Sequence, residues 1–407
     1  MILHQPELSR ADGKLRVAAR IEARHPKLAG LERLWFEVDS DRGVELGDRA
    51  DPFLAAMIPV AMACGENVEV RGRTSPRLAW GIRELQHIHF AWWPRHLNVI
   101  DVRCETLEEA PLAQRGAGVA CAFSGGVDSL YTTWRHTENR EEIPGFRLSH
   151  ALLVNGFDLD VDPEETGRFE TLEAIYAPLL APLGVALVTV RTNMREFRVA
   201  GVGRGRTIRS FGTALSACAL ALSPSLGRFY LAAARGYNDF HADGSNPSTD
   251  HLIGTAGFQC IHDGADVPTR FAKVAVIAAW PEALAKLRVC SNPGWQSVDP
   301  ARGVIDNCGT CRKCTWTQTS LELITGRREF PGFRHARSRS SLRSAAQHNP
   351  HRAEENLHEA LARGRRDIAF DIRCGSAQRV LEHWFRPILG HRRQRRARAA
   401  QVAPPVH

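Results

Sequence analysis

The chain has 407 residues, which is enough for two to three domains of roughly 150 residues each and for a sizeable buried core. Its 43% hydrophobic and 24% charged residues exclude a fully disordered chain, a collagen-like repeat and a small disulfide-linked scaffold. The net charge of +8 is unevenly spread, because residues 331–407 hold 16 Arg against 6 acidic residues. The rest of the chain is therefore close to neutral.

The sequence favours a cytoplasmic protein without a membrane partner. The longest apolar stretch, Pro52 to Cys64, is shorter than the roughly 20 residues that span a bilayer, and it contains Pro59. The first residues, MILHQPELSRADGK, lack the apolar core of a signal peptide. Ten cysteines, four of them in one region, suit a reducing compartment with a metal cluster.

Residues 1–115 are predicted to form a small α+β domain. Two helix-like runs, Asp51 to Cys64 and Ser75 to Trp93, are accompanied by strand-like runs at residues 15–23, 33–38, 67–72 and 97–104.

Residues 116–330 alternate between short apolar runs and longer helix-like segments. The strand-like runs are residues 118–123, 150–154, 185–190, 228–233 and 258–261, and the helix-like segments are residues 129–137, 164–183, 209–222 and 271–289. This alternation predicts the α/β class, with a doubly wound parallel sheet. In such sheets, ligands bind beyond the carboxyl ends of the strands.

Residues 331–407 are predicted to form a basic helical extension. Val380, Trp384 and Ile388 recur at i+4, and Pro387 should kink or end their helix. The arginine-rich run His391 to Ala400 suits phosphates of a nucleic acid, but we favour a solvated chain end because no recognisable nucleic-acid module accompanies it.

The most informative motif, SGGVDS, follows the first of the predicted parallel strands and precedes a helix. It comprises Ser124, Gly125, Gly126, Val127, Asp128 and Ser129, and we call it the SGGVDS loop. The glycines allow a sharp turn, the helix N-terminus presents free N–H groups and the serines add hydroxyls. These features predict a cradle for a polyanion. Because Asp128 would repel phosphate, its position predicts a bridging Mg²⁺ ion.

A second motif is a cluster of cysteines near residue 310. Cys308, Cys311 and Cys314 are spaced C-x2-C-x2-C, and Cys290 lies upstream. Four thiolates predict tetrahedral Zn²⁺ in a structural role, because they leave no open position for water. An iron–sulfur cluster is the alternative.

The SGGVDS loop resembles the PP-loop of the ATP pyrophosphatases. Together with the late cysteines, it most resembles the proteins similar to 7-cyano-7-deazaguanine synthase, in an uncharacterised bacterial branch. The resemblance covers about Gly118 to Gly326. It implies cleavage of ATP between the α- and β-phosphates, giving an adenylated substrate and pyrophosphate. The chain departs from that enzyme in its first 115 residues and in its late polar loop, so the substrate is not carried over.

The resemblance also implies positions for the nucleotide. Family members contact the adenosine at the end of the second strand, which here ends in Asn155 and Gly156. They commonly place a late lysine on the phosphates, and Lys273 is one of only five lysines in this chain. We expect Asp128, Ser129 and Lys273 to be catalytic. Further candidates after the third strand are Asn193, for the nucleotide, and Arg204, Arg206 and Arg209, for an anion.

An acceptor substrate should bind the polar loop that follows the fourth parallel strand, because that loop lies at the carboxyl edge of the sheet. The candidates are Asn238, Asp239, Ser245 and Asp250, together with Arg270.

We therefore expect an ATP-dependent ligase. An acceptor oxygen, most simply of a carboxylate, attacks the α-phosphorus, and a nitrogen nucleophile then displaces AMP. The loop would clamp pyrophosphate, Asp128 would hold Mg²⁺ and Lys273 would offset charge. The chain begins Met1-Ile2 and shows no glutaminase half, so ammonia or an amine would be free or supplied by a partner. Homodimerisation stays open.

Two other functions remain open from the sequence. A tRNA-modifying, thiolation-type enzyme would use the terminal arginines and a reactive cysteine, for which Cys121, Cys218 and Cys260 are candidates. A non-catalytic protein could retain the fold and bind the nucleotide only.

Overall fold

The computed structural model describes residues 1–157, 163–203, 209–292 and 297–381. The chain divides into two compact units. The first comprises Met1–Arg288 with Val298–Val304, and the second Val289–Ser297 with the residues from Ile305 onward. Arg204, Arg206 and the arginine-rich run 391–400 lie outside the described residues, as does most of the predicted run from Val380 to Leu389.

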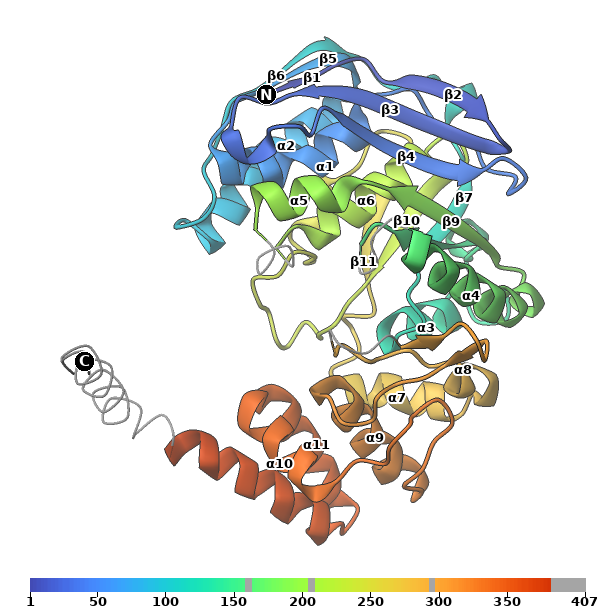
Figure 1. The fold of residues 1–407 in the computed structure, drawn as a ribbon, viewed down its shortest axis with the longest axis vertical. Coiled ribbons are helices and arrows are strands. Elements are labelled where there is room, and N and C mark those ends of the chain that lie inside the picture. The colour runs from blue at the N-terminus through green and yellow to red at the C-terminus, as the bar shows by residue number, and fades with distance from the viewer. Residues whose placement is uncertain (158–162, 204–208, 293–296, 382–407) are drawn as a thin grey trace, which may run out of the picture. The chain divides into compact units, whose positions relative to one another are not determined.

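A mixed sheet of 11 strands is the framework of the first unit (Figure 1). Its strands are β1 (Ile2–Leu3), β2 (Glu7–Ala11), β3 (Lys14–Glu22), β4 (Arg33–Asp39), β5 (Val68–Thr74), β6 (Val102–Leu107), β7 (Gly118–Ala122), β8 (His150–Asn155), β9 (Ala186–Thr192), β10 (Leu226–Ala232) and β11 (Gln259–Asp263). They lie in the order β11-β10-β7-β8-β9-β4-β3-β1-β5-β6, and β2 pairs with β3.

The strands from β7 to β11 all pair in parallel. From β7 the chain moves to β8 and β9 on one side, and then returns past β7 to β10 and β11 on the other. The strand order therefore reverses between β7 and β10. Because crossovers are right-handed, the helices of the two directions cover opposite faces. The predicted α/β class is confirmed, with a sheet dominated by parallel pairs.

The helices of this unit are α1 (Asp51–Cys64), α2 (Pro76–Trp92), α3 (Val127–Arg135), α4 (Pro163–Leu180), α5 (Met194–Gly201), α6 (Phe211–Ala221), α7 (Arg270–Ala278) and α8 (Pro281–Ala285). Short 3-10 turns occupy Pro26–Leu28, Leu112–Gln114, Pro144–Phe146, Ala181–Leu183 and Asp250–Leu252. The long helix predicted at residues 271–289 is two helices, because Pro281 cannot donate a helical hydrogen bond. Both β2 and α5 were missed by the sequence prediction.

Helix α1 is almost entirely enclosed. Twelve of its 14 residues are buried, and it contacts α2, α5, α6 and β5. Figure 1 shows α5 and α6 running alongside it. A helix that is apolar on all sides needs such cover.

Residues 1–115 share this core and this sheet with the later residues. Strand β4 pairs antiparallel with β9, with Phe36 opposite Thr192 and Glu37 opposite Arg191. The sheet is thus continuous across residue 115, where the sequence suggested a domain boundary. The division into three domains stays a prediction.

The second unit is mainly helical, with α9 (Arg312–Thr325), α10 (Arg339–His348), α11 (Pro350–Ala362) and a further helical stretch at residues 366–381. The chain enters this unit after Arg288, returns to the first unit at Val298 and leaves it again after Val304. The short strands β12 (Val298–Asp299) and β13 (Val304–Ile305) lie at the second and third of these crossings. Helix α9 contacts both α10 and α11. Its buried Glu322 forms ion pairs of 2.7 Å with Arg337 and with Arg365, so this carboxylate is compensated.

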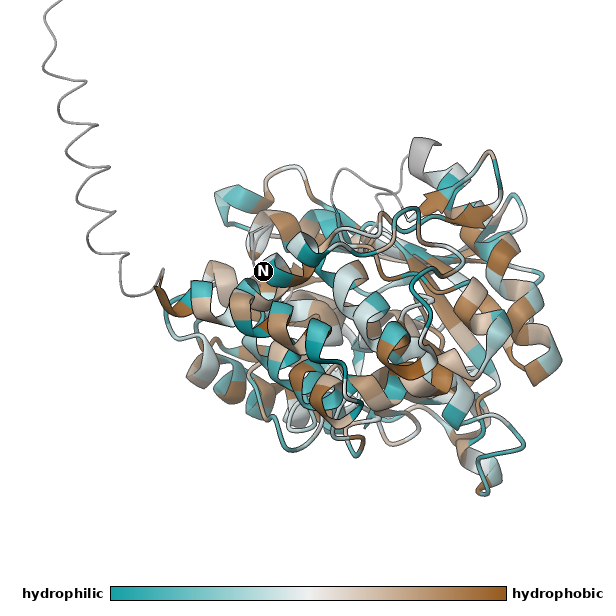
Figure 2. Ribbon diagram, turned by 90° about the horizontal axis from the view of Figure 1, so that it is seen from below, coloured by the Kyte–Doolittle hydropathy of each residue, from teal (hydrophilic) through white to brown (hydrophobic). Residues whose placement is uncertain are grey.

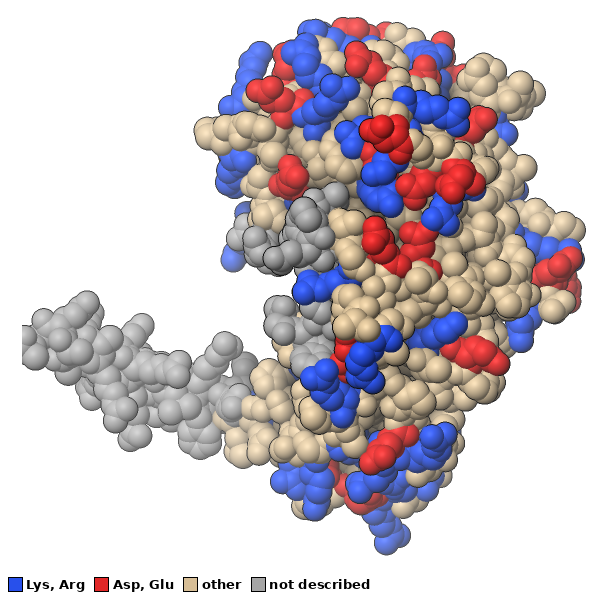
Figure 3. Space-filling model, turned by 45° about the vertical axis from the view of Figure 1, so that its right-hand side comes forward, with Lys and Arg blue, Asp and Glu red and all other residues tan. Residues whose placement is uncertain are grey.

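Surface composition fits an ordinary globular chain. Many helices carry both apolar and polar residues (Figure 2), as expected when one face packs on a core. On the face drawn in Figure 3, acidic and basic side chains are interspersed. No helix in the described part of the chain is long and apolar enough to cross a membrane.

Candidate functional site

The SGGVDS loop joins β7 to α3. Gly125 has a φ of +69°, and a Cβ there would lie 1.7 Å from the Tyr176 hydroxyl oxygen. Tyr176 is fully buried and its hydroxyl donates to the Lys286 carbonyl at 3.0 Å, so it cannot move aside easily. Glycine is required at this turn because φ is positive and because Tyr176 leaves no space for a Cβ.

Two serine hydroxyls close the loop on itself. Ser129 Oγ donates to the Gly126 carbonyl at 3.2 Å and accepts from the Ser124 amide at 3.3 Å. The Gly126 amide donates to Ser124 Oγ at 3.3 Å. These bonds are slightly longer than the usual range, so oxygens of a bound anion could replace them at little cost. The loop leads into the first turn of α3, where helix N–H groups are free to bind an anion.

A cavity of about 330 Å³ opens beside this loop, beyond the carboxyl ends of β7, β8 and β10. Its polar end is formed by Ser124, Asp128, Ser129 and Arg288, and its remaining wall is mostly apolar, including Leu152, Leu153, Val154, Phe157, Phe169, Leu172, Phe211, Leu215 and Leu231. The cavity lies where the strand order reverses, the usual ligand position in open α/β sheets. Its size suits a small organic ligand with one charged end.

Asp128 has one oxygen in use and one without a partner. Oδ2 lies 3.4 Å from Arg270 Nη2, which brings two predicted site residues together. Oδ1 is buried and has no hydrogen-bond partner in the described part of the chain. A carboxylate oxygen without a donor, next to an anion-binding turn, fits a Mg²⁺ ligand.

Arg288 is a site residue that sequence reasoning missed. Its amide donates to the Gly125 carbonyl at 2.8 Å, and its Nη1 lies 3.5 Å from the Ser124 carbonyl oxygen. Its Nε is buried and unpartnered among the described residues. The guanidinium lines the polar end of the cavity. Its position depends on residues far away in the chain, so no local motif distinguishes it from the other arginines.

The phosphate contact of Lys273 stays a prediction, and the structure shows this residue bonded to the backbone just after β10. Its Nζ donates to the Ala233 carbonyl at 2.6 Å and lies 5.5 Å from the centre of the Tyr131 ring. Its side chain is buried, and Lys273 is not part of the wall of the 330 Å³ cavity described above. Its hydrogen bond holds the backbone just after β10, where the neighbouring residues Ala232 and Ala234 line that cavity.

The three predicted residues at the ends of β8 and β9 lie outside the cavity wall. Asn155 is buried with its Oδ1 unpartnered among the described residues. Gly156 has a φ of +99° and its Cα lies against the Thr192 carbonyl, where a Cβ would come within 1.9 Å. Asn193 bonds through its amide to the backbone of Arg33 and Trp35, so it fastens β4 to the end of β9.

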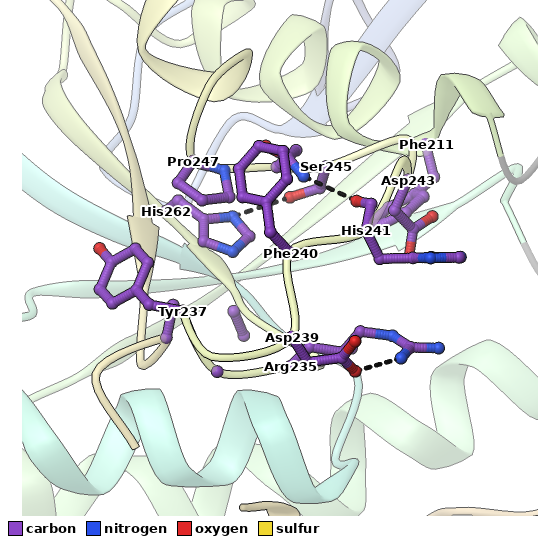
Figure 4. A pocket seen from close by; sticks show the side chains of 15 residues that line it. Phe211, Arg235, Tyr237, Asp239, Phe240, His241, Asp243, Ser245, Pro247 and His262 are labelled. Atoms are coloured by element: carbon purple, nitrogen blue, oxygen red, sulfur yellow. Dashed lines mark hydrogen bonds and ion pairs between the residues drawn. The ribbon is translucent and has the colours of Figure 1, made fainter. Parts of the chain in front are cut away.

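The predicted acceptor loop surrounds a second, smaller pocket of about 40 Å³, shown in Figure 4. Asp239 and Ser245 line this pocket, Asn238 is exposed and Asp250 is buried behind Ser245. The pocket and the larger cavity share the wall residues Phe211, Ala232 and Ala234. The smaller pocket therefore adjoins the larger cavity.

The four cysteines predicted to bind metal come together in the second unit. Their Sγ atoms all lie within 4.8 Å of one another, with Cys308 to Cys314 at 3.9 Å and Cys290 to Cys311 at 4.0 Å. Tetrahedral zinc with Zn–S bonds of about 2.3 Å requires sulfur separations of about 3.8 Å. The cluster can hold a metal ion such as zinc.

The surroundings of the cluster are built to hold it. Asn307 Oδ1 accepts from the amides of Val289 and Cys290, and the Cys311 amide donates to Cys308 Sγ at 3.3 Å. Without a cation, a hydrogen bond from Cys314 lowers the pKa of Cys311 to about 4, while the pKa of Cys314 is raised. Four thiolates this close need a cation to offset their charge.

The cysteines considered for sulfur transfer are enclosed. Cys121, Cys218 and Cys260 are buried, and burial raises the pKa of each thiol, to about 12 for Cys121 and Cys218. Thiols of this kind are inert at neutral pH.

No family model, curated protein or solved structure matches the chain.

Proposed function

We propose that the protein is an ATP-dependent ligase, with a fold of the PP-loop type, that adenylates an acceptor carboxylate and releases pyrophosphate. The observation that carries this proposal is the 330 Å³ cavity with the SGGVDS loop at its polar end, at the point where the strand order reverses. An apolar wall suits a nucleobase, and the polar end suits phosphates.

Each part of the cavity has a role in this reaction. Ser124, Ser129 and the first amides of α3 would hold the departing pyrophosphate, and Arg288 would balance its charge. Asp128 would hold Mg²⁺, which neutralises phosphate charge when it is bound. An oxygen of the acceptor displaces pyrophosphate from the α-phosphorus, and a nitrogen nucleophile then displaces AMP. Catalysis by positioning and charge requires no covalent bond to the protein.

Product analysis tests the proposal. The protein is incubated with ATP, MgCl₂ and a panel of carboxylic acids, and AMP and pyrophosphate are measured. Asp128→Asn should lower their formation by about 100-fold or more, the cost of removing a group that stabilises the transition state. Asp41→Asn is the matched control, since that side chain is 82% exposed and away from the cavity wall. Formation of ADP and orthophosphate would refute the proposal.

Two other results would indicate a different function. A tRNA-modifying enzyme should show tRNA binding that weakens steeply with salt. Tight ATP binding without pyrophosphate release, whatever the acceptor, would indicate a non-catalytic nucleotide-binding protein.

A further inference from the structure

The smaller pocket contains an aspartate–histidine pair that the proposed reaction has not yet used. His262 lies on β11, and its Nδ1 is 2.8 Å from Asp250 Oδ2. Asp250 also accepts from Ser245 Oγ at 2.6 Å and, through Oδ1, from the Asn246 amide at 3.1 Å. Asp250 is only 1% exposed. Three donors therefore fix the orientation of this buried carboxyl group.

This arrangement selects the protonated nitrogen of His262. Because Asp250 can only accept, Nδ1 must carry the hydrogen, and in the neutral ring Nε2 then carries the free electron pair. His262 lines the pocket, and Nε2 has no hydrogen-bond partner in the part of the chain that the structure describes. The ring is therefore oriented as a proton acceptor by its aspartate.

The cluster is not a serine nucleophile with its base. In such triads the serine hydroxyl faces Nε2 while the carboxylate holds Nδ1. Here Ser245 Oγ lies 3.3 Å from Nδ1, a contact that a dashed line marks in Figure 4. The same hydroxyl donates to Asp250 Oδ2, the carboxylate oxygen that also contacts His262. Ser245 orients Asp250 instead of attacking a substrate.

The size of the pocket indicates what the base would act upon. A volume of about 40 Å³ accommodates a molecule of the size of water or ammonia. The carboxylates on its wall are Asp239, which is paired with Arg235, and Asp243, whose only hydrogen bond among the described residues is from the Gly244 amide. The wall also carries Arg235 and His241, whose charge acts on Asp243, so the volume of the pocket, and not its charge, favours ammonia.

We propose that His262 is the general base of the transfer step, held in position by Asp250, and that the smaller pocket admits the nitrogen nucleophile. This inference rests on the proposed function. The nitrogen of ammonia attacks the acyl carbon of the adenylate and forms a C–N bond, while the acyl C–O bond breaks and AMP leaves. The proton released by the nitrogen goes to His262 Nε2. The pocket and the cavity share the wall residues Phe211, Ala232 and Ala234, so the base would act next to the cavity in which we propose that the adenylate forms.

The test separates the two half-reactions in His262→Gln. Exchange of pyrophosphate into ATP reports adenylation alone, and amide formation with ammonium chloride as the probe reports transfer. We expect exchange to stay within about twofold and transfer to fall about 100-fold, a typical loss for a general base. Hydroxylamine, which is largely uncharged at neutral pH, should restore much of the transfer. His251→Gln, an exposed histidine of the same loop, is the control.

Transfer at the normal rate in His262→Gln would overturn the inference alone, and absence of exchange in the unchanged protein would overturn it together with the proposed function.

A second measurement needs no substrate. Nitrogen-15 NMR of the full chain labelled in histidine should show His262 with its hydrogen on Nδ1, identified by its loss in His262→Gln. A hydrogen mainly on Nε2 would also overturn the inference.

Discussion

Arg288 and Lys273 are two cations that lie in different surroundings. The guanidinium of Arg288 lines the larger cavity at the SGGVDS loop, whereas Lys273 is buried with its ammonium on the Ala233 carbonyl. The resemblance to PP-loop enzymes, together with the rarity of lysine in this chain, led us to assign the phosphate contact to Lys273, and this stays a prediction. The cation in the cavity wall, Arg288, comes from another segment.

We expect Arg288→Ala to weaken ATP binding by about 10- to 100-fold, because one hydrogen bond to a charged group contributes about 1.5–3 kcal/mol. Titration calorimetry with ATP measures this change. Arg302→Ala, at a side chain that is 66% exposed, should bind ATP normally. Unchanged affinity in Arg288→Ala would remove this residue from the site.

The SGGVDS loop could be found from the sequence because its chemistry lies in six consecutive residues. The residues that surround the loop could not be found from the sequence. The need for glycine at position 125 comes partly from Tyr176, and the pair of His262 with Asp250 joins a strand to a loop that was predicted only as polar. Partners brought together by tertiary packing leave no spacing signal in the chain.

At the scale of elements, α3 is fastened to β11 at the end opposite the loop. His136, just after α3, lies between two carboxylates, with Nε2 at 2.9 Å from Asp263 and Nδ1 at 2.8 Å from Glu141. Its ring stacks on Tyr230 at 4.0 Å. Thr132 adds a hydrogen bond of 2.6 Å to Asp263. This network sets the direction in which the first turn of α3 points.

The network predicts loss of stability in acid. Burial alone would raise the pKa of Asp263, but hydrogen bonds and charge from His136 and the hydrogen bond from Thr132 outweigh it and hold the pKa below its ordinary value. A carboxyl with a lowered folded-state pKa stabilises the fold above its ordinary pKa, near about 4, and this contribution is lost as the pH falls through the lowered value. Asp263→Asn should therefore melt lower than the unchanged protein at pH 7, and the difference should shrink in acid. A difference independent of pH would contradict this.

The cysteine cluster joins the segment before β12 to the start of α9. Cys311→Ser should lower both the zinc content and the melting temperature, because metal binding is coupled to folding. Metal analysis and thermal unfolding of the same sample measure this. Cys374→Ser, a half-buried thiol of the same unit outside the cluster, is the control. Full metal content with normal melting would exclude a four-thiolate site, and iron in the sample would favour the iron–sulfur alternative.

The positions of helices and strands were predictable where the hydrophobic pattern of the sequence was strong. The five parallel strands and α1 match their predicted ranges closely, since each is a compact apolar run. β2 and α5 were not predicted. All five residues of β2 are exposed, so alternation gives no signal, and α5 is only eight residues long.

At the scale of the whole molecule, residues 1–115 and the parallel strands form one sheet and one core. Residues 116–407 produced alone would leave the β9 edge unpaired and the α1-contacting face of α6 exposed. We expect this fragment to aggregate or to lack a cooperative thermal transition, measured by circular dichroism. A fragment that melts cooperatively would instead support the separate N-terminal domain that the sequence suggested.

Enclosure of α1 also has a consequence for biosynthesis. The ribosome releases Asp51–Cys64 long before Phe211–Ala221, which covers it, has been translated. Until then a nearly all-apolar segment stays uncovered, and in a nascent chain such segments aggregate. We therefore expect yield in a host cell to rise when chaperones that bind apolar segments are supplied in excess, and to depend on the speed of translation.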